Sequence, residues 1–392
     1  MKSKIFLLSL VVLLVFGLAF AGCAPDEPEE VVDEPEEVVD EPEEVEEEPD
    51  ADHPDFPGYP ADLVEAAQAE GRVNVYNWSF FIDDDRVETF EEKFGIDVTY
   101  DLYESNEEMK TKIMAGGSGY DVVYPSDHMV YEMRELGLLQ ELNHDWLPNM
   151  DDLMDMWVDP FFDPGNSYSV GYMWGTTGYA YNKEQVGDDP RLGSWALLFE
   201  GEEYAGRMTM SEDANEPVGA ALHYLGYSAN SEDPDELEEA REVLLQQNPW
   251  VSAYISGPVR EQLIAGDIWI AQFWSGDTLW ASLENPDIGY VVPEEGAYIW
   301  IDSMCIPADA PNPAAAHLWI NYMMEPEVQA AIVEYVMFPS AIEGAQDYLD
   351  AEYLENPAIY PDEELFDRLE LGMPFVGEPR DIRESIWEEL IY

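Results

Sequence analysis

An aromatic ring and a carboxylate stand two residues apart in the stretch GAYIWIDSMCIP, which runs from Gly296 to Pro307. Trp300 and Asp302 lie in a run rich in aromatic and β-branched residues, so in a strand both side chains point to the same face. A ring face attracts positive charge, and a carboxylate pairs with it. The pattern predicts half of a site for an organic cation. The simpler interpretation places Trp300 in the core and makes Asp302 a hydrogen-bonding group at a strand end.

Two other stretches hold residues that would complete such a site. FWSGD contains Trp274 and Asp277, and SEDANE contains Asp213 and Glu216. Taken singly, these carboxylates are also typical of solvated loops and helix caps, and Asp277 is well placed to cap a helix that begins at Thr278. The prediction of a cation site therefore depends on the three stretches meeting in the fold.

The charge balance of the chain narrows the class of partner. Of 392 residues, 86 are acidic and 16 are basic, which gives a net charge of -70. Phosphate contacts require Lys and Arg, so a nucleic-acid binder that uses a basic patch is excluded. Without residues 1–52 the chain still has 69 acidic against 14 basic residues, about -55. This acidity favours cationic partners or a halophilic source.

The N-terminus predicts export and a lipid anchor. Lys2 and Lys4 precede an apolar run from Ile5 to Ala21, and FAGC follows, which resembles a bacterial lipobox. We expect a lipoprotein signal peptide over residues 1–22, lipid on Cys23, and a location in the periplasm or at the cell surface. A membrane-spanning helix is the alternative, but the run is at the short limit for one. With Cys23 lipidated, Cys305 stands alone as a buried, apolar residue.

A repeated acidic segment follows Cys23. The unit DEPEEVV recurs with a proline in every repeat and no Lys or Arg, a pattern that fits neither a helical seam nor a packed core. Like charges repel and proline stiffens the backbone, so we expect residues 23–60 to form an extended, disordered tether.

Strands and helices alternate through the rest of the chain. The first expected strands are 72–78, 96–102 and 120–124, each followed by a helix, which predicts a mainly parallel sheet covered on both faces. Ligands bind beyond the carboxyl ends of such strands, where Trp78, Ser79 and Ser126 stand. Residues 171–181 are extended and rich in glycine and aromatic residues, as suits a crossing between domains. A second α/β set follows, with expected strands at 207–210, 268–273 and 288–292.

Several stretches in order resemble one family. VYNWSFF, DLYESNEEM, YDVVYPSDHMV, FDPGNSYSVGYMWGTTG, HYLGYSANSEDPDELEEA, FWSGD and YIWIDSMCIPADA are similar to stretches of the periplasmic spermidine/putrescine-binding proteins of ABC importers. The resemblance implies an α/β fold of the two-lobed periplasmic-binding-protein type, a clamshell in which each lobe is a mainly parallel sheet flanked by helices and hinge crossings join the lobes. We place lobe 1 at 61–174 plus 300–338, and lobe 2 at 175–299 plus 339–392.

The same resemblance implies a ligand and a set of residues that bind it. The expected ligand is a polyamine, putrescine or spermidine, delivered to an ABC permease and its ATPase by a monomeric protein with no cofactor, metal or catalytic residue. The implied site combines aromatic walls, hydroxyl groups and carboxylates from both lobes. Its residues are Trp78, Ser79, Ser126, Asp213, Glu216, Trp274, Asp277, Trp300 and Asp302. His128, Phe81 and Phe338 depart from the family pattern, in which hydroxyl groups often stand at these places, and this bears on ligand length.

Other functions stay open at this stage. A binding protein for another organic cation such as betaine needs an aromatic cage and fewer carboxylates, and a ligand-sensing lipoprotein would never meet a permease. Iron-binding relatives often use paired tyrosines, and no Tyr-Tyr occurs. A secreted glycosidase would use Asp213 and Glu216 as an acid and base pair. The chain contains no HExxH or GxSxG motif that would favour an enzyme.

Overall fold

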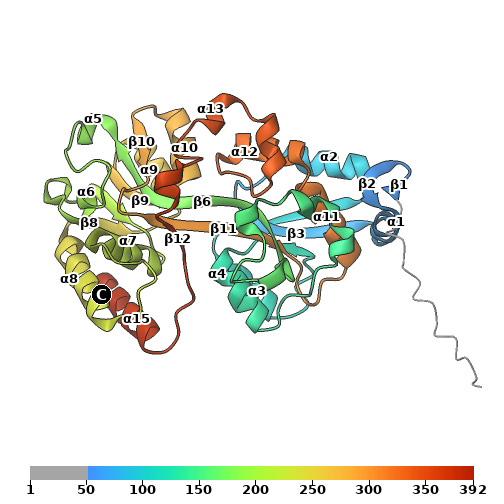
Figure 1. The fold of residues 1–392 in the computed structure, drawn as a ribbon, viewed down its shortest axis with the longest axis horizontal. Helices are drawn as coiled ribbons and strands as arrows, with labels where there is room; N and C mark the ends of the chain where they lie inside the picture. Colours follow the sequence, from blue (N-terminus) through green and yellow to red (C-terminus); the bar gives the residue numbers. More distant parts are fainter. Residues whose placement is uncertain (1–51) are drawn as a thin grey trace, which may run out of the picture. The chain divides into compact units, whose positions relative to one another are not determined.

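A computed structural model describes residues 52–392 of the chain (Figure 1). The predicted signal peptide (1–22), the lipidation site at Cys23 and the tether up to residue 51 lie outside the described residues. No helix between residues 52 and 392 has both the length and the apolar character that a membrane span requires.

The first group of elements surrounds three parallel strands. β3 pairs in parallel with both β4 and β5, and its alternating Val73 and Val75 are buried, as the sequence pattern predicts. The Asp83 side chain caps α2 at its start, and Gly95 ends the helix in the left-handed conformation. The elements are α1 (Ala61–Glu70), β3 (Arg72–Trp78), α2 (Asp84–Phe94), β4 (Asp97–Tyr103), α3 (Asn106–Met114), β5 (Val122–Val123), α4 (Asp127–Glu135), α11 (Pro313–Met323) and α12 (Pro326–Val336).

A second group repeats this plan. β7 pairs in parallel with β8 and β9, and the short strand β8 was not expected from the sequence. The elements are α5 (Lys183–Val186), α6 (Ala196–Phe199), β7 (Met208–Met210), α7 (Asn215–Leu225), α8 (Pro234–Gln247), β8 (Val251–Tyr254), α9 (Val259–Ala265), β9 (Ile270–Trp274), α10 (Ser275–Glu284), β10 (Ile288–Val291) and α15 (Glu378–Ile391).

Short elements fill the connections. The remaining α-helices and strand are α13 (Ala351–Leu354), α14 (Glu363–Phe366) and β12 (Leu369–Leu371). The 3₁₀ turns are His144–Trp146, Pro148–Asp152, Asp155–Trp157, Pro164–Asn166, Glu202–Tyr204, Asn248–Trp250 and Glu343–Tyr348.

Two long strands join the groups. β6 (Ser169–Asn182) and β11 (Ala297–Cys305) pair antiparallel and connect the parallel strands into one ten-stranded sheet, in the order β4-β3-β5-β11-β6-β9-β7-β8 (Figure 1). β10 pairs with β6, and β12 pairs with β11. The chain thus crosses between two α/β lobes along β6 and β11, the two stretches predicted to be crossings.

The pairing of β6 with β11 contains one irregularity next to the predicted site. Asp302 lies opposite Met173, but Ser303 lies opposite Gly171, so Tyr172 is an extra residue on β6. The ring of Tyr172 is fully buried, and its hydroxyl donates to the backbone oxygen of Phe81 at 2.7 Å. The bulge therefore fastens the crossing to the loop that follows β3.

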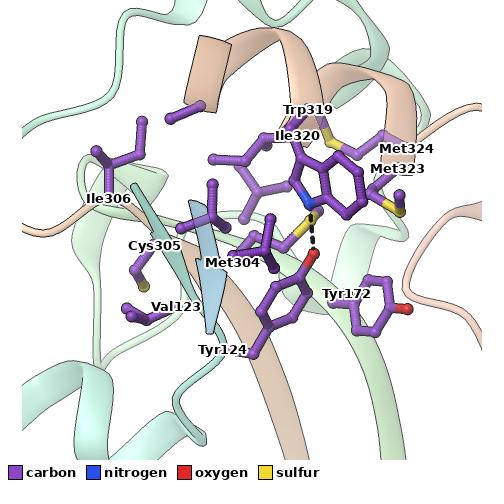
Figure 2. Packing of buried hydrophobic residues seen from close by; sticks show 14 of the residues in the cluster. Val123, Tyr124, Tyr172, Met304, Cys305, Ile306, Trp319, Ile320, Met323 and Met324 are labelled. Carbon is purple, nitrogen blue, oxygen red and sulfur yellow. Dashed lines mark hydrogen bonds between the residues drawn. The ribbon is translucent and has the colours of Figure 1, made fainter. Parts of the chain in front are cut away.

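Each lobe has its own cluster of buried side chains. In the first cluster, Trp319 of α11 donates from Nε1 to the Tyr124 hydroxyl at 2.8 Å, and Met304 and Cys305 pack close by (Figure 2). Cys305 is a free, fully buried thiol, which confirms its prediction as an apolar core residue. Tyr124 directly precedes Pro125 and Ser126, so this packing fixes the position of a predicted site residue.

The packing differs from the predicted lobe boundaries after α12. Ala341 and Ile342, expected in lobe 2, belong to the buried cluster of the first lobe. The reason is that the chain leaving α12 returns along β6, where Met173 and Ser340 form a β-bridge. The last helix does pack in the second cluster, through Ile386 and Leu390.

The predicted tether ends earlier than residue 60. β1 (Asp52–His53) and β2 (Phe56–Pro60) form a small antiparallel sheet, so this part of the prediction is wrong. The acidic repeat has given way here to aromatic residues that can be buried. Tyr59 is 2 % exposed, packs edge-on against Phe94 and hydrogen-bonds through its hydroxyl to Glu325.

We predict that Tyr59→Ala lowers the free energy of unfolding by about 3–5 kcal/mol, because it deletes a buried ring and leaves a cavity. Tyr59→Phe keeps the ring and loses only the hydrogen bond to Glu325, so about 0.5–1.5 kcal/mol is expected. Urea unfolding of the three proteins measures both. A loss below about 0.5 kcal/mol for Tyr59→Ala, the range of ordinary surface substitutions, would mean that β2 is not part of the folded body.

Candidate functional site

The Asp302 carboxylate is the most deeply buried of the predicted site carboxylates. It lies on β11 with 3 % of its surface exposed, and the Ser126 hydroxyl donates to its Oδ1 at 2.6 Å. Asn106 holds that serine, because its amide donates to Ser126 Oγ at 3.0 Å and its carbonyl accepts from the Ser126 backbone N–H. Among residues 52–392, no donor reaches Asp302 Oδ2, so one oxygen of a fixed carboxylate is available to a ligand.

Burial raises the pKa of Asp302 to about 7, and the nearby charge of Asp127 adds to this effect. The hydrogen bond from Ser126 and the neighbouring His128 oppose the shift without cancelling it. A buried carboxylate with a raised pKa favours a cationic partner, because pairing with a positive charge restores the ionised form.

Asp127 and His128 form a pair beside Asp302, and neither was among the predicted site residues. Asp127 is 3 % exposed, its Oδ1 lies 3.4 Å from His128 Nδ1, and its Oδ2 has no hydrogen-bond partner in the described part of the chain. Burial lowers the pKa of His128, but Asp127, Asp213 and Glu107 outweigh this and raise it to about 9. The acidic groups around His128 therefore favour its protonated form.

Glu216, in the first turn of α7, is a second carboxylate with a raised pKa. Its Oε1 accepts hydrogen bonds from the Thr177 hydroxyl at 2.8 Å and from Trp274 Nε1 at 3.1 Å. Burial raises the pKa of Glu216 to about 7, and the charge of Asp213 adds to this, although its hydrogen bonds work in the opposite direction. Thr177 lies on β6, so the crossing strand and the second lobe together position this group.

Asp213 links the two ends of the site electrostatically. It is exposed in the loop after β7, and its Oδ1 accepts from the backbone N–H of Asn215 at 2.9 Å. Its charge raises the pKa of both Glu216 on α7 and His128 on α4. The two predicted halves of the site, one in each lobe, therefore face a common region.

On β11, Trp300 lies between Asp302 and the residue opposite Thr177, which binds Glu216. On β11, Tyr298, Trp300 and Asp302 share a face, opposite Thr177, Gly175 and Met173 of β6. Four residues of strand separate Thr177 from Met173, about 13 Å. The Trp300 ring packs against Gly175, where a Cβ would stand 2.6 Å from Cζ2, so only glycine fits there. Trp300 Nε1 is buried without a hydrogen-bond partner among the described residues.

Trp78 is the last residue of β3 and Ser79 follows it, but their polar atoms bind other parts of the protein. Trp78 Nε1 donates to the backbone oxygen of Tyr124 at 2.8 Å, and its ring packs on Tyr103. Ser79 Oγ donates to Glu104 at 2.8 Å.

Asp277 stands apart from the other carboxylates. It lies in the first turn of α10 and forms an ion pair with Arg260 of α9. Burial raises the pKa of Asp277, and Arg260 opposes this. The stretches that supply the site contain no Lys or Arg, but the fold brings Arg260 from outside them to Asp277. Asp277 and Ser79 line a separate pocket, and Phe338 lines it too.

The structure thus brings together Ser126 with Asp302, and Glu216 with Trp274, and places Trp300 between them. The sequence interpretation missed Thr177, Asp127 and Arg260. Asp127 had a signal, because it directly follows Ser126 at the start of a helix. Thr177 and Arg260 act only through tertiary contacts, and no local pattern marks them. Residues 52–392 contain no cluster of three or more His, Cys, Asp or Glu side chains placed to hold a metal ion.

Two α/β lobes with buried carboxylates and rings between them define a binding protein. A family model described as bacterial extracellular solute-binding protein matches residues 85–361. The putrescine-binding periplasmic protein SpuD of Pseudomonas aeruginosa (strain UCBPP-PA14) is 36% identical over 328 residues, covering 80% of this chain and 89% of that protein. The spermidine/putrescine-binding periplasmic protein of Escherichia coli (strain K12) is 34% identical over 330 residues, covering 83% and 94%.

Solved structures agree with these relatives. The spermidine/putrescine ABC transporter substrate-binding protein PotD of Streptococcus pneumoniae superposes with a TM-score of 0.75 at 32% identity, covering 81% of this chain and 98% of that one. The chain belongs to the family of bacterial extracellular solute-binding proteins, a family of transporter components rather than enzymes. The predicted family resemblance and the two-lobed α/β fold are confirmed.

The raised pKa of Asp302 predicts an unusual dependence of stability on pH. For an acid whose folded pKa exceeds its unfolded value, stability is lost as pH rises from the unfolded pKa, about 4, to the folded one, about 7. Asp302→Asn removes this loss. We expect the variant to have a free energy of unfolding higher than wild type by about 2–4 kcal/mol at pH 8, with the difference vanishing near pH 4.

Urea unfolding of both proteins at several pH values, without ligand, measures this difference. Asp347→Asn, an exposed carboxylate remote from the site, is the matched control and should change the unfolding free energy by less than about 0.5 kcal/mol at every pH. A difference that does not change between pH 4 and 8 would show that Asp302 is ionised in the folded protein throughout.

Proposed function

We propose that this chain is an extracytoplasmic solute-binding protein that captures a linear polyamine, putrescine or spermidine, and delivers it to an ABC permease. The observation that carries the proposal is the pair of carboxylates, Asp302 and Glu216, on either side of the Trp300 ring. Neither forms an ion pair with a Lys or Arg of the described chain, in contrast to Asp277. The names of the relatives, which bind putrescine or spermidine, support the same ligand class.

The chemistry of a polyamine matches this arrangement. Each ammonium group loses its water on binding and needs a carboxylate in return, because an unpaired buried charge costs several kcal/mol. The methylenes between the ammonium groups need flat apolar walls, which Trp300 and Trp274 would provide. A ligand with a single ammonium group, such as betaine, would leave either Asp302 or Glu216 without a partner. Two carboxylates therefore favour a ligand with at least two positive charges.

The other residues have supporting roles in this proposal. Ser126 orients Asp302, and the Thr177 hydroxyl and Trp274 N–H orient Glu216. Asp213 adds negative charge at the entrance, and we place Trp78 and Ser79 at the rim. No catalytic step is included in this proposal, in keeping with a family of transporter components.

Closure of the lobes and attachment to a membrane complete the proposal. Asp302 is held by Ser126 at the start of α4 in the first lobe, and Glu216 lies on α7 of the second lobe. A ligand bound to both carboxylates would therefore draw the lobes together about β6 and β11. We further propose that the monomeric protein is anchored through lipid on Cys23, and that the permease it serves is driven by an ATPase.

We predict that Asp302→Asn weakens putrescine binding by about thirty-fold to several thousand-fold, equivalent to roughly 2–5 kcal/mol. The variant keeps the shape of the side chain and removes its charge, so the loss is electrostatic. Isothermal titration calorimetry measures it, with Asp347→Asn as the control that keeps wild-type affinity. Binding within two-fold of wild type would remove Asp302 from the ligand site.

The affinity for putrescine should also fall as the solution is acidified. Asp302 and Glu216, with pKa values of about 7, must be ionised to pair with ammonium groups. The ligand stays protonated throughout this range, as does His128 with its pKa of about 9. Between pH 8 and pH 6 we expect a loss of up to about a hundred-fold, ten-fold for each carboxylate.

Calorimetry in buffers of different ionisation enthalpy would also count the protons released on binding below pH 7. Asp302→Asn should retain only the ten-fold contribution of Glu216. An affinity that changes by less than three-fold between pH 6 and pH 8 would contradict the assignment of these two groups.

A further inference from the structure

The crossing strand β6 changes its pairing partner at one residue, Gly178. On one edge of β6, the pairing with β11 extends to Thr177, and the pairing with β10 begins at Tyr179 (Figure 1). β9 pairs with residues 177–181 along the other edge. Gly178 therefore lies at the junction between the part of β6 that pairs with the other crossing strand and the part that pairs within the second lobe.

The hydroxyl of Tyr290, on β10, provides the hydrogen bonds of the backbone at this junction. It lies 2.7 Å from the Gly178 backbone nitrogen, 2.7 Å from the Thr176 backbone oxygen and 2.9 Å from Thr176 Oγ1. A phenol has one hydrogen, which it donates to the Thr176 carbonyl, so it accepts from the Gly178 N–H and from the Thr176 hydroxyl. One side chain thus fixes the backbone on both sides of Thr177.

The close approach of β10 to β6 explains why residue 178 is a glycine. A Cβ at this position would stand 2.1 Å from the Val291 backbone oxygen and 3.0 Å from the Tyr290 hydroxyl. A backbone oxygen cannot move aside as a flexible side chain can, so a larger residue would push β10 away from β6. The contacts of the Tyr290 hydroxyl therefore require Gly178.

Thr177, the residue between these two contacts, binds a carboxylate of the proposed site. Its side chain is almost fully buried, and its Oγ1 donates to Glu216 Oε1 at 2.8 Å. Thr177 lies opposite Trp274 of β9, whose Nε1 donates to the same oxygen. Because a threonine side chain has few rotamers, the position of its backbone determines where its hydroxyl lies.

We propose that Tyr290 is a positioning residue for ligand binding, which fixes the backbone on both sides of Thr177 and so holds the Thr177 hydroxyl against Glu216. The proposal rests on the polyamine function proposed above, in which Glu216 pairs with an ammonium group. In this role Tyr290 does not contact the ligand, and its effect on binding passes through Thr177.

The titration of Glu216 gives this role a measurable signature. Burial raises the pKa of Glu216 to about 7, the charge of Asp213 adds to this, and the hydrogen bond from Thr177 opposes it. Loss of that bond should raise the pKa of Glu216 further, so the ionised form that pairs with ammonium is lost at a higher pH. The Tyr290 hydroxyl stays protonated, because burial raises its pKa and the charge of Glu216 adds to this.

The test is a double-mutant cycle of Tyr290→Phe and Thr177→Val, with putrescine binding measured by calorimetry at pH 6 and pH 8. We expect each single variant to bind at least about five-fold more weakly than wild type at pH 6, and the loss at pH 8 to be about three-fold smaller or less. The double variant should bind within about two-fold of Thr177→Val, because the effect of Tyr290 passes through that hydroxyl. Tyr254→Phe removes a hydroxyl that bonds to Asn248 elsewhere in the second lobe, and it should keep wild-type affinity at both pH values.

Two results of the cycle would overturn the proposal. If the losses of the single variants multiply in the double variant, Tyr290 acts by another route. If Tyr290→Phe binds within two-fold of wild type at pH 6, it does not act on the site. Should Tyr290→Phe fail to fold, Thr176→Val removes one hydrogen bond of the same hydroxyl, and binding at least about two-fold weaker at pH 6 is expected, whereas unchanged binding overturns the proposal.

A second measurement does not depend on the ligand. Carbon NMR follows the titration of the Glu216 carboxyl in the ligand-free protein, with Glu216→Gln to assign its signal. Tyr290→Phe and Thr177→Val should both raise the pKa of Glu216, and an unchanged pKa in Tyr290→Phe overturns the proposal. If wild type binds no putrescine, the polyamine function itself fails, and this titration alone decides whether Tyr290 positions Thr177.

Discussion

The antiparallel pairing of β6 with β11 is the constraint on which the site depends. Each strand begins in one lobe and ends in the other, and their pairing brings Thr177, Gly175 and Met173 opposite Tyr298, Trp300 and Asp302. The ring of Trp300 can occupy its position only because its partner residue is glycine. The helices α4 and α7 begin beside this pair of strands, and their first turns place Asp127 and Glu216 next to β11 and β6.

Unpaired negative charge in low-dielectric surroundings gives the site its character. Asp302 and Glu216 are held by neutral donors, which orient a carboxylate without neutralising it, and both retain raised pKa values. Where an internal cation does approach a carboxylate, as Arg260 approaches Asp277, that group becomes part of the protein's own structure. The same residue type therefore takes two roles, and the neighbour decides between them.

Much of this could be predicted from local patterns. Local structure follows from the alternating valines of β3, the glycine after α2 and the extended stretch of β6, because each pattern depends only on its own segment. Trp300 and Asp302 share a face because side chains alternate along a strand with a period of two. The contacts of Asp277 could not be predicted, since Arg260 is distant from it in sequence and approaches through the packing of α9 on α10. The strands β1 and β2 were not predicted, because residues 52–60 were interpreted together with the acidic repeat that precedes them. Two aromatic rings in this segment decide its local structure instead.

The bulge at Tyr172 has a consequence for how this gene can vary over evolutionary time. Because side chains alternate between the faces of a strand, a slip of one residue turns every following side chain to the opposite face. Loss of one codon at the bulge would be absorbed by regular pairing, which keeps Gly175 opposite Trp300 but removes the contact of Tyr172 with the loop after β3. Loss of a second codon between Ser169 and Gly175 would force such a slip and would move Gly175 away from Trp300. This stretch can therefore shorten by one residue at most, whereas surface loops elsewhere in the chain are free to lengthen and shorten.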